Sequence, residues 1–261
     1  MADIFSVANQ VVLVSGGTRG IGYAIAEGFA RRGALVVVTG RTAEAANEAA
    51  AKLRAEAMFP PIGVACDVAD GEQVKRLAAS VLEMFGRVDV LINVAGVNRR
   101  KPAIEVTDED YDYILGTNLR GAFFLSREIG RSMLEKKSGC QINIASLNTD
   151  KPLKNVMPYA VSKAGIAHMT RSLALEWGPS GVRVNAIAPG FIVTDLTRKL
   201  WSDETMQAWG LANTPQRRLG TPEDLVGAAL FLASPASAFM TGQCLYVDGG
   251  FTAGFAWPIP G

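Results

Sequence analysis

Short apolar runs alternate with helix-like segments along the whole chain, and this alternation limits the fold more than any other feature. The runs are strand-sized, rich in β-branched residues and mostly continuous. They comprise Val11–Val14, Leu35–Thr39, Ile62–Ala65, Val88–Ile92, Gln141–Ala145, Val182–Ile187 and Cys244–Val247. Continuous apolar strands are typical of parallel sheets that are covered by helices on both faces. The sequence therefore predicts an α/β fold, Rossmann-like and doubly wound, with about seven parallel strands.

The length and the absence of a linker predict a single domain. The chain has 261 residues, of which 49% are hydrophobic and 20% charged, and this suits one α/β domain with a large core. No repeat or low-complexity tract divides it, so we expect one domain over residues 1–261. The segment 190–220 is polar and departs from the strand–helix rhythm, as functional excursions in compact domains often do. Because it carries Trp201 and Trp209, we expect a lid of short helices over a site.

Composition excludes several other classes of protein. The formal net charge is +1, so no strong field attracts nucleic acid or a membrane surface. Cys66, Cys140 and Cys244 are widely separated, which favours buried thiols in a reducing compartment over disulfides or a metal site. His168 is the single histidine, so we expect no metal and assign it a packing or interface role. Neither a signal peptide nor a run long enough to span a membrane is present, and we expect a cytoplasmic protein.

A glycine-rich turn follows the first predicted strand and opens the first predicted helix. Residues 15–22 read Ser-Gly-Gly-Thr-Arg-Gly-Ile-Gly. Glycines let the backbone approach a pyrophosphate, and the helix N-terminus supplies free N–H groups and a positive dipole end. A purely structural turn would look similar, but the strand before it and the helix after it are the context that dinucleotide binding requires. The predicted contacts in this turn are Gly16, Thr18, Arg19, Gly20, Ile21 and Gly22.

The end of the second predicted strand indicates which dinucleotide is bound. An acidic residue there would bind a ribose 2′-hydroxyl and repel a 2′-phosphate. This chain has Gly40 at that position, followed by Arg41. Arg41 and Arg19 could together hold a 2′-phosphate through charge-assisted hydrogen bonds, although each could also be a solvated surface residue. We therefore expect NADP(H) to be preferred, with NAD(H) as the alternative.

Two residues follow the third predicted strand and are candidate contacts for the adenine ring. Asp67 is placed to accept a hydrogen bond from the base, and Val68 is its neighbour. The alternative for Asp67 is a helix N-cap for the segment that starts near Asp70. The sequence leaves both interpretations open.

A tyrosine and a lysine share one face of a predicted helix. Tyr159 and Lys163 are four positions apart, so their side chains point the same way. A nearby cation favours tyrosinate and lowers a phenol pKa that is ordinarily about 10, as proton transfer near neutral pH requires. A half-buried tyrosine beside a surface lysine would give the same pattern. Ser146 favours the catalytic interpretation, because it ends a predicted strand, where ligands gather in parallel sheets, thirteen positions before Tyr159.

These motifs, taken in order, resemble the short-chain dehydrogenase/reductase family over nearly the whole chain. The resemblance implies a catalytic tetrad of Asn118, Ser146, Tyr159 and Lys163. It also implies coenzyme contacts from Asn93, Ala95, Gly96, Pro189, Gly190, Ile192 and Thr194, together with Tyr159 and Lys163. The chain departs from the family pattern at Ser15, where threonine is usual, and at Val94, where a second asparagine is usual.

The resemblance also implies a mechanism. Tyr159 as tyrosinate would take the hydroxyl proton of an alcohol while hydride passes to the nicotinamide, and reduction would run in reverse. Ser146 would hold the reacting oxygen. Lys163 would lower the tyrosine pKa and bind the nicotinamide ribose, and Asn118 would hold a water that links Lys163 to solvent. Within this family the basic run Arg99-Arg100-Lys101 and residues 214–225, Thr-Pro-Gln-Arg-Arg-Leu-Gly-Thr-Pro-Glu-Asp-Leu, resemble gluconate 5-dehydrogenases.

Three consecutive cations in the loop after Gly96 are candidate substrate contacts. Arg99, Arg100 and Lys101 follow the fourth predicted strand, at the rim of the site. A solvated charge run is the alternative. In gluconate 5-dehydrogenases an arginine of this loop meets the sugar-acid carboxylate, and we carry that role to Arg100 first and to Arg99 second. The other predicted substrate contacts are Ser146, Asn148 and Tyr159, with Lys154 and Trp201 near them.

Two other functions fit parts of the sequence. A 3-oxoacyl-carrier-protein reductase, or a general ketone reductase, would have the same tetrad, and the basic loop could then dock an acidic carrier protein. A binding protein that only senses the coenzyme would have a damaged tetrad, whereas all four members are present. The predicted helix 160–177 is apolar on more than one face, and the resemblance implies a dimer interface there, usually within a homotetramer.

Overall fold

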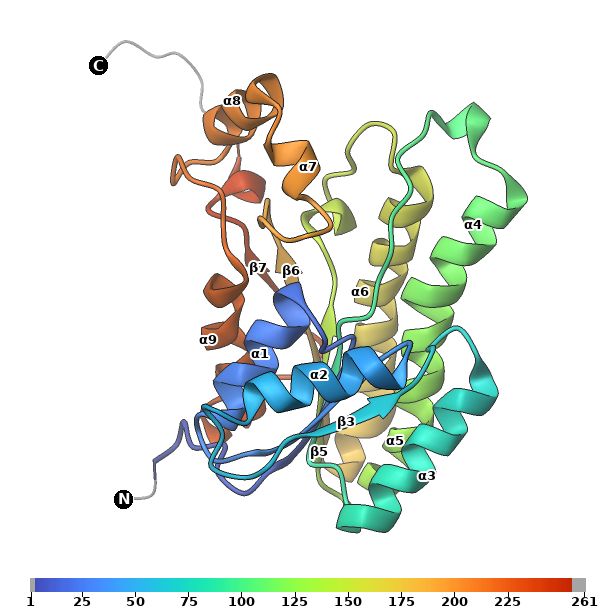
Figure 1. The fold of residues 1–261 in the computed structure, drawn as a ribbon, viewed down its shortest axis with the longest axis vertical. Coiled ribbons are helices and arrows are strands. Elements are labelled where there is room, and N and C mark those ends of the chain that lie inside the picture. Colours follow the sequence, from blue (N-terminus) through green and yellow to red (C-terminus); the bar gives the residue numbers. More distant parts are fainter. Residues whose placement is uncertain (1–2, 255–261) are drawn as a thin grey trace.

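One parallel sheet forms the centre of the computed structural model, which describes residues 3–254. Its strands in that range are β1 (Val11–Ser15), β2 (Leu35–Gly40), β3 (Ile62–Ala65), β4 (Val90–Asn93), β5 (Gly139–Ile144), β6 (Val182–Pro189) and β7 (Cys244–Val247). They pair in parallel in the order β3-β2-β1-β4-β5-β6-β7. The chain fills one half of the sheet and then returns to β4 to build the other, which is the doubly wound topology. The predicted Rossmann-like fold is confirmed (Figure 1).

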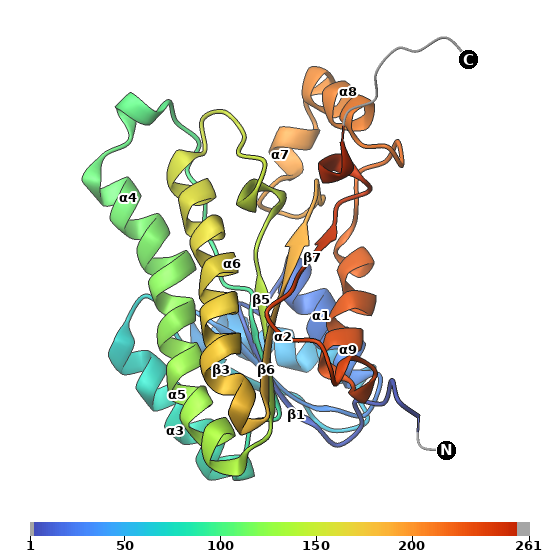
Figure 2. The same ribbon diagram turned by 180° about the vertical axis from the view of Figure 1, so that it is seen from behind.

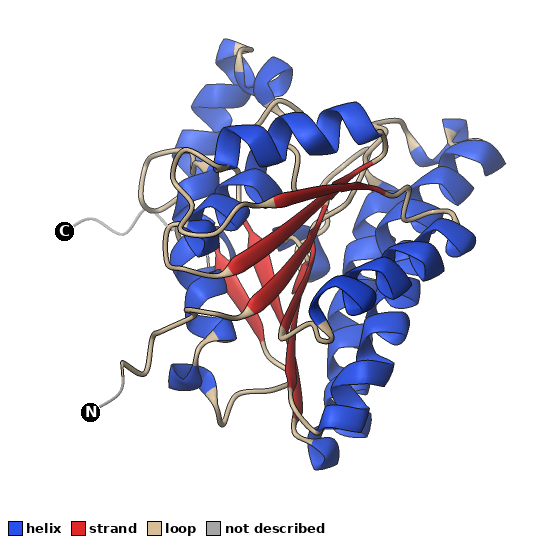
Figure 3. Cartoon of the chain, turned by 60° about the horizontal axis from the view of Figure 1, so that its bottom comes forward, coloured by secondary structure: helices blue, strands red, loops and turns tan. Residues whose placement is uncertain are grey.

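Helices cover both faces of this sheet. They are α1 (Gly20–Ala30), α2 (Ala43–Leu53), α3 (Gly71–Phe85), α4 (Asp108–Leu115), α5 (Gly121–Lys136), α6 (Met157–Trp177), α7 (Arg198–Trp201), α8 (Glu204–Asn213) and α9 (Val226–Ala233). Helices α1, α2 and α9 pack on one face, and α3, α5 and α6 pack on the other (Figures 1 and 2). The sheet is therefore enclosed between two helical layers (Figure 3).

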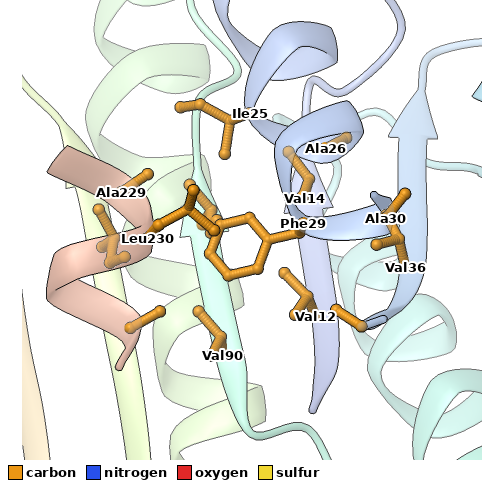
Figure 4. Close-up of a cluster of buried hydrophobic side chains, with 14 of the residues drawn as sticks. Val12, Val14, Ile25, Ala26, Phe29, Ala30, Val36, Val90, Ala229 and Leu230 are labelled. Atoms are coloured by element: carbon orange, nitrogen blue, oxygen red, sulfur yellow. The ribbon is translucent and has the colours of Figure 1, made fainter. Parts of the chain in front are cut away.

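Burial on both faces explains why the strands are apolar without interruption. Val12 and Val14 of β1 join the core under α1 and α9, whereas Leu13 between them joins the core under α3 and α5. Phe29 of α1 is fully buried at the centre of the first core (Figure 4). Burial of a large apolar side chain of this kind stabilises the fold by about 1.5–3 kcal/mol. These two cores hold the strand ends, and therefore the site above them, in fixed positions.

The segment 190–220 forms two short helices, α7 and α8, that lie beyond the ends of β5 and β6 (Figures 1 and 2). An aromatic cluster holds it in place. The ring of Phe191 contacts that of Trp201 at 5.1 Å, that of Trp209 at 5.5 Å and that of Phe251 at 4.8 Å, measured between centroids. This segment is thus packed against the domain. Within the described residues, no helix combines the length and apolarity needed to cross a membrane.

Candidate active site

The glycine turn between β1 and α1 adopts a backbone that side chains would block. Gly16 and Gly20 have positive φ angles of 73° and 54°, which glycine adopts without a steric penalty. A Cβ atom on Gly16 would lie 2.7 Å from the backbone nitrogen of Ala95, and one on Gly22 would lie 2.2 Å from the carbonyl oxygen of Gly16. The turn therefore brings the backbone close to the fourth strand and aims the free N–H groups of the first turn of α1 at the space above it.

Most of the predicted coenzyme contacts line one cavity above this turn. Its volume is about 260 Å³. The predicted residues in its wall are Gly16, Thr18, Arg19, Gly20, Ile21, Gly22, Arg41, Asp67, Val68, Ala95, Gly96 and Thr194. They come from the ends of β1 to β4 and from the segment after β6, which is where dinucleotides bind in this topology.

Two arginines flank an adjoining hollow at the end of β2. Arg19 and Arg41 are exposed, and neither forms an ion pair within residues 3–254. The carboxylate in this hollow, Glu48, is paired with Lys52 at 2.7 Å. A Cβ atom on Gly40 would lie 2.5 Å from the methyl carbon of Thr18, so any larger residue there would require Thr18 to move. The hollow suits a phosphate group, and the observed residues fit NADP(H).

The structure separates the two interpretations of Asp67. The N-cap of α3 is Asp70, whose carboxylate accepts hydrogen bonds from the backbone N–H groups of Glu72 and Gln73. The helix-cap interpretation of Asp67 is therefore wrong. Its carboxylate accepts from the N–H of Ala69 at 3.0 Å, and the residue lines the cavity.

Asn93, a predicted coenzyme contact, has its side chain elsewhere. Its amide donates to Ser126 and Asn143, both at 2.9 Å, and Asn143 in turn donates to Thr170. The residue does not line this cavity. Side chains alternate between the faces of a strand, and this pleat directs Asn93 beneath α5 and α6. Its amide therefore joins two strands to the helical layer.

A second cavity, which we call the substrate cavity, adjoins the first, which we call the coenzyme cavity. Three of the four predicted catalytic residues, Ser146, Tyr159 and Lys163, line it. Its volume is about 210 Å³, and Ile21, Val94, Gly96 and Thr194 belong to the walls of both cavities. The predicted residues in its wall are Arg100, Ser146, Asn148, Tyr159, Lys163, Pro189, Gly190, Ile192, Thr194 and Trp201. Tyr159 and Ser146 thus lie together beside the coenzyme cavity.

Tyr159 and Lys163 project from the same face of α6. The Lys163 ammonium lies 5.7 Å from the centre of the Tyr159 ring and donates to the carbonyl oxygen of Ile144 at 2.6 Å. The lysine is 4% exposed, and burial lowers its pKa to about 8. A buried ammonium held by the end of β5 is therefore poised to exchange its proton near neutral pH.

The pKa of Tyr159 is raised, whereas the sequence predicts that Lys163 lowers it. Burial raises the phenol pKa above its ordinary value, and this outweighs the lowering by hydrogen bonding with Ser146 and by the charge of Arg100. Lys163 is itself desolvated and is directed at Ile144, so in this structure its charge does not lower the pKa of Tyr159 below 10. Tyr159 is thus held as a neutral phenol, the form that donates a proton to a carbonyl oxygen.

Ser146 is held by its neighbour Asn148. The Ser146 hydroxyl oxygen accepts from the backbone N–H of Asn148 at 3.1 Å and from its side-chain amide at 3.3 Å. The carbonyl oxygen of the same amide accepts from the N–H of Leu153 at 2.9 Å. Asn148 lines the cavity, but its hydrogen bonds fix Ser146. Because the oxygen accepts both of these hydrogen bonds, the hydroxyl group can donate its own proton to another oxygen atom.

Asn118 lies in a π-helical turn, Gly116–Arg120, between α4 and α5. Such turns often occur at functional sites. The side-chain oxygen accepts from the N–H of Val97 at 2.7 Å, and the amide donates to the carbonyl of Val97 at 2.9 Å and to Ser162 at 3.0 Å. The side chain therefore fastens the loop after β4 to α6, directly behind Lys163.

The structure divides the three consecutive cations. Arg99 and Lys101 both pair with Asp110, which is 3% exposed, and the Arg99 guanidinium also lies 4.6 Å from the ring centre of Tyr113. These two cations lower the pKa of the Asp110 carboxyl. Arg99 does not line the substrate cavity, and its substrate contact stays a prediction that this arrangement does not favour. Arg100 lines it and forms no ion pair with the described residues.

Sequence reasoning missed Asp110 and Asn98, along with several apolar residues of the cavity walls. Asp110 caps α4 together with Thr107, and nothing in the local pattern shows that it also reaches the basic loop. Asn98 lines the substrate cavity. Its position in the loop after β4, beside the basic run, was a usable signal.

Comparison with known proteins gives one consistent result. A family model described as enoyl-(acyl carrier protein) reductase matches residues 16–252. The gluconate 5-dehydrogenase of Gluconobacter oxydans is 38% identical over 96% of this chain and 97% of that protein. The 3-oxoacyl-acyl-carrier-protein reductase of Chlamydia muridarum is 37% identical over 94% of this chain and 98% of its own length. A crystal structure of a gluconate 5-dehydrogenase from Burkholderia cenocepacia, in complex with NADP and tartrate, is 34% identical and has a TM-score of 0.94 over 97% of this chain and 99% of that one.

The matches cover the cavities, the sheet and the helices together. The two cavities described above and these full-length similarities lead to the same assignment. The chain belongs to the short-chain dehydrogenase/reductase family of oxidoreductases.

Proposed function

We propose that this protein transfers hydride between NADP(H) and a secondary hydroxyl or keto group of a sugar acid, with gluconate and 5-ketogluconate as its substrate pair. The observation that carries the proposal is Arg100, an unpaired cation in the same cavity wall as Ser146 and Tyr159. A guanidinium that forms two hydrogen bonds with a carboxylate would hold a polyol acid in one orientation, with one carbon atom at Tyr159. The similar structure from Burkholderia cenocepacia was solved with NADP and with tartrate, a hydroxy acid.

The proposed chemistry uses four residues of this chain. The nicotinamide ring of the coenzyme, when bound, supplies or accepts the hydride. In reduction, Tyr159 donates its phenol proton to the carbonyl oxygen, and Ser146 holds that oxygen by a hydrogen bond. Lys163 stabilises the tyrosinate that results and returns a proton to it, and Asn118 holds the loop behind Lys163 in place. Oxidation follows the same path in reverse.

The basic loop favours a sugar acid over the carrier-protein alternative. Two of its three cations, Arg99 and Lys101, are engaged with Asp110. Their charge is therefore partly neutralised, which weakens this loop as a docking surface for an acidic carrier protein. The remaining cation, Arg100, faces a cavity of small-molecule size. A coenzyme-sensing role without catalysis has no support from this arrangement, because Tyr159 and Lys163 lie together in the site.

The chain is proposed to work as one domain, with the segment 190–220 as the lid of its site. The lid role is supported by its aromatic residues, which line the substrate cavity. We also propose a homotetramer, or a homodimer, that acts in the cytoplasm. Apolar side chains on the outer surface of α6 support assembly: Leu175 is 80% exposed and Val161 is 44% exposed.

Replacing Arg100 with methionine tests the substrate proposal. We expect kcat/KM for 5-ketogluconate to fall by roughly 10- to 100-fold, because a hydrogen bond to a charged group contributes about 1.5–3 kcal/mol. L-sorbose has the same carbon skeleton with a hydroxymethyl group in place of the carboxylate, so its kcat/KM should change little. An equal loss for both sugars would show that Arg100 supports the fold and does not read the carboxylate.

The pH dependence follows from Lys163. Its pKa is lowered to about 8, so the ammonium is protonated below pH 8 and neutral above it. The neutral form can neither stabilise tyrosinate nor return a proton, and we expect kcat/KM for ketone reduction to fall as the pH rises through about 8. Initial rates at saturating coenzyme across this range would measure it. A flat profile through the same range would contradict the proton-relay role of Lys163.

A further inference from the structure

Two unsatisfied polar atoms occur in residues that line the substrate cavity. Among the described residues, five buried side-chain atoms have no hydrogen-bond partner in the protein. Two of them, Asn98 Oδ1 and Trp201 Nε1, belong to residues in this wall. Buried polar groups in native proteins are normally satisfied, and exceptions need an explanation, of which a ligand is one.

The indole of Trp201 is fixed by its surroundings. The residue is 6% exposed and packs in an apolar cluster with Leu147 and Phe191. Its ring meets Phe191 edge-on at 5.1 Å. The far edge of the ring covers Gly210 of α8, where an added Cβ atom would lie 2.9 Å from Trp201 Cζ3. The indole N–H is therefore not free to turn to solvent for a partner.

The two atoms have complementary chemistry. An indole N–H can only donate a hydrogen bond, and a carbonyl oxygen can only accept one. A hydroxyl group does both, so a polyol can satisfy both atoms, whereas an aliphatic chain satisfies neither. A site built to bond a substrate hydroxyl strongly rejects analogues that lack it, because its own polar groups are then left unpaired.

Their positions place them apart from the groups that are already assigned. Asn98 comes from the loop after β4, on the same strand end as Arg100, and Trp201 comes from α7 in the lid. Both share a cavity wall with Ser146 and Tyr159. If the substrate carboxylate binds Arg100 and its carbonyl oxygen binds Tyr159, the carbon atoms between these two groups lie along the rest of this wall.

We propose that Trp201 Nε1 and Asn98 Oδ1 select substrates by hydrogen bonding to the hydroxyl groups between the carboxylate and the reacting carbon. This inference rests on the proposed sugar-acid activity and names the residues that would distinguish a polyol acid from a plain oxo acid. Trp201 also ties selection to the lid, because the same ring that packs α7 and α8 carries the donor.

The test compares two substrates in three variants. 5-Ketogluconate and 5-oxohexanoate share the carboxylate, the chain length and the position of the ketone, but the second has no hydroxyl groups. Trp201→Phe removes the N–H and keeps an aromatic ring. Trp177→Phe makes the same change at a buried residue at the end of α6, which lines neither cavity.

We expect Trp201→Phe to lower kcat/KM for 5-ketogluconate roughly tenfold and to leave that for 5-oxohexanoate within about twofold. Asn98→Ala should shift the ratio of the two in the same direction. In Trp177→Phe the two values should change together, so that their ratio stays that of the wild type. Thermal unfolding and NADPH binding, measured on each variant, separate a loss of selectivity from a loss of fold.

The outcomes separate this inference from the proposed function. If Trp201→Phe folds and both substrates lose activity equally, or neither does, the hydroxyl-selecting role is wrong and the sugar-acid activity of the wild type stands. If the wild type reduces 5-oxohexanoate as well as 5-ketogluconate, the selection does not exist. If it reduces no sugar acid at all, the proposed function and this inference both fail.

Discussion

Replacing Tyr159 with phenylalanine is expected to lower kcat in both directions by roughly 10²- to 10⁴-fold, the usual contribution of a positioned acid–base group. The change removes one oxygen atom and leaves the ring between Ser146 and Lys163. The phenol lies in the substrate cavity, where it can pass a proton to a substrate oxygen. Hydrogen bonding with Ser146 and the charge of Arg100 both act to lower its pKa. Single-turnover kinetics with NADPH and 5-ketogluconate would measure the loss.

Two controls make this result specific. Tyr111→Phe makes the same change at an exposed position on α4, outside both cavities, and should behave as wild type. NADPH binding to Tyr159→Phe, followed by nucleotide fluorescence, should remain within a few-fold of wild type. If Tyr159→Phe turns over substrate as fast as the wild type, the acid–base assignment is wrong.

The second large effect is expected at the end of β2. Replacing Arg19 and Arg41 together with alanine should raise the Kd for NADPH by roughly 10²-fold or more and change that for NADH little. Each guanidinium can form charge-assisted hydrogen bonds worth about 1.5–3 kcal/mol to a 2′-phosphate, with exposure to solvent reducing the total. The ratio of the two dissociation constants is the measurement, because it cancels general effects on the cleft.

Arg54→Ala is the matched control for this double variant. Arg54 is an exposed residue at the C-cap of α2 and lines neither the coenzyme cavity nor the adjoining hollow. It should leave both dissociation constants unchanged. A wild-type protein that binds NADH as tightly as NADPH would contradict the interpretation of Arg19 and Arg41 before any variant is made.

Local patterns predicted the framework well, for a physical reason. A strand buried on both faces must be apolar throughout, so β1 and β2 could be recognised in the sequence without knowledge of their neighbours. The glycine turn is likewise a local requirement of backbone geometry. The end of α2 was less predictable. The Ala- and Glu-rich segment continues to Ala57, but the helix ends at Leu53.

The parts that could not be predicted depend on distant neighbours. Arg99 and Arg100 are neighbours in the sequence, but Arg99 is the one that pairs with Asp110. That contact joins the loop after β4 to α4. The raised pKa of Tyr159 arises from burial by the whole domain, which the spacing of Tyr159 and Lys163 cannot show. Asn93 follows the pleat of its strand and therefore lies under α5 instead of in the cleft. Each of these required the assembled sheet.

One measurement tests the central claim most directly. Purified protein is mixed with NADPH and 5-ketogluconate, and oxidation of the reduced nicotinamide is followed by absorbance, in parallel with NADH and with a 3-oxoacyl thioester. The account predicts turnover of 5-ketogluconate with NADPH, at a kcat/KM well above that with NADH and above that for the thioester. Turnover of the thioester with no reduction of 5-ketogluconate would contradict it.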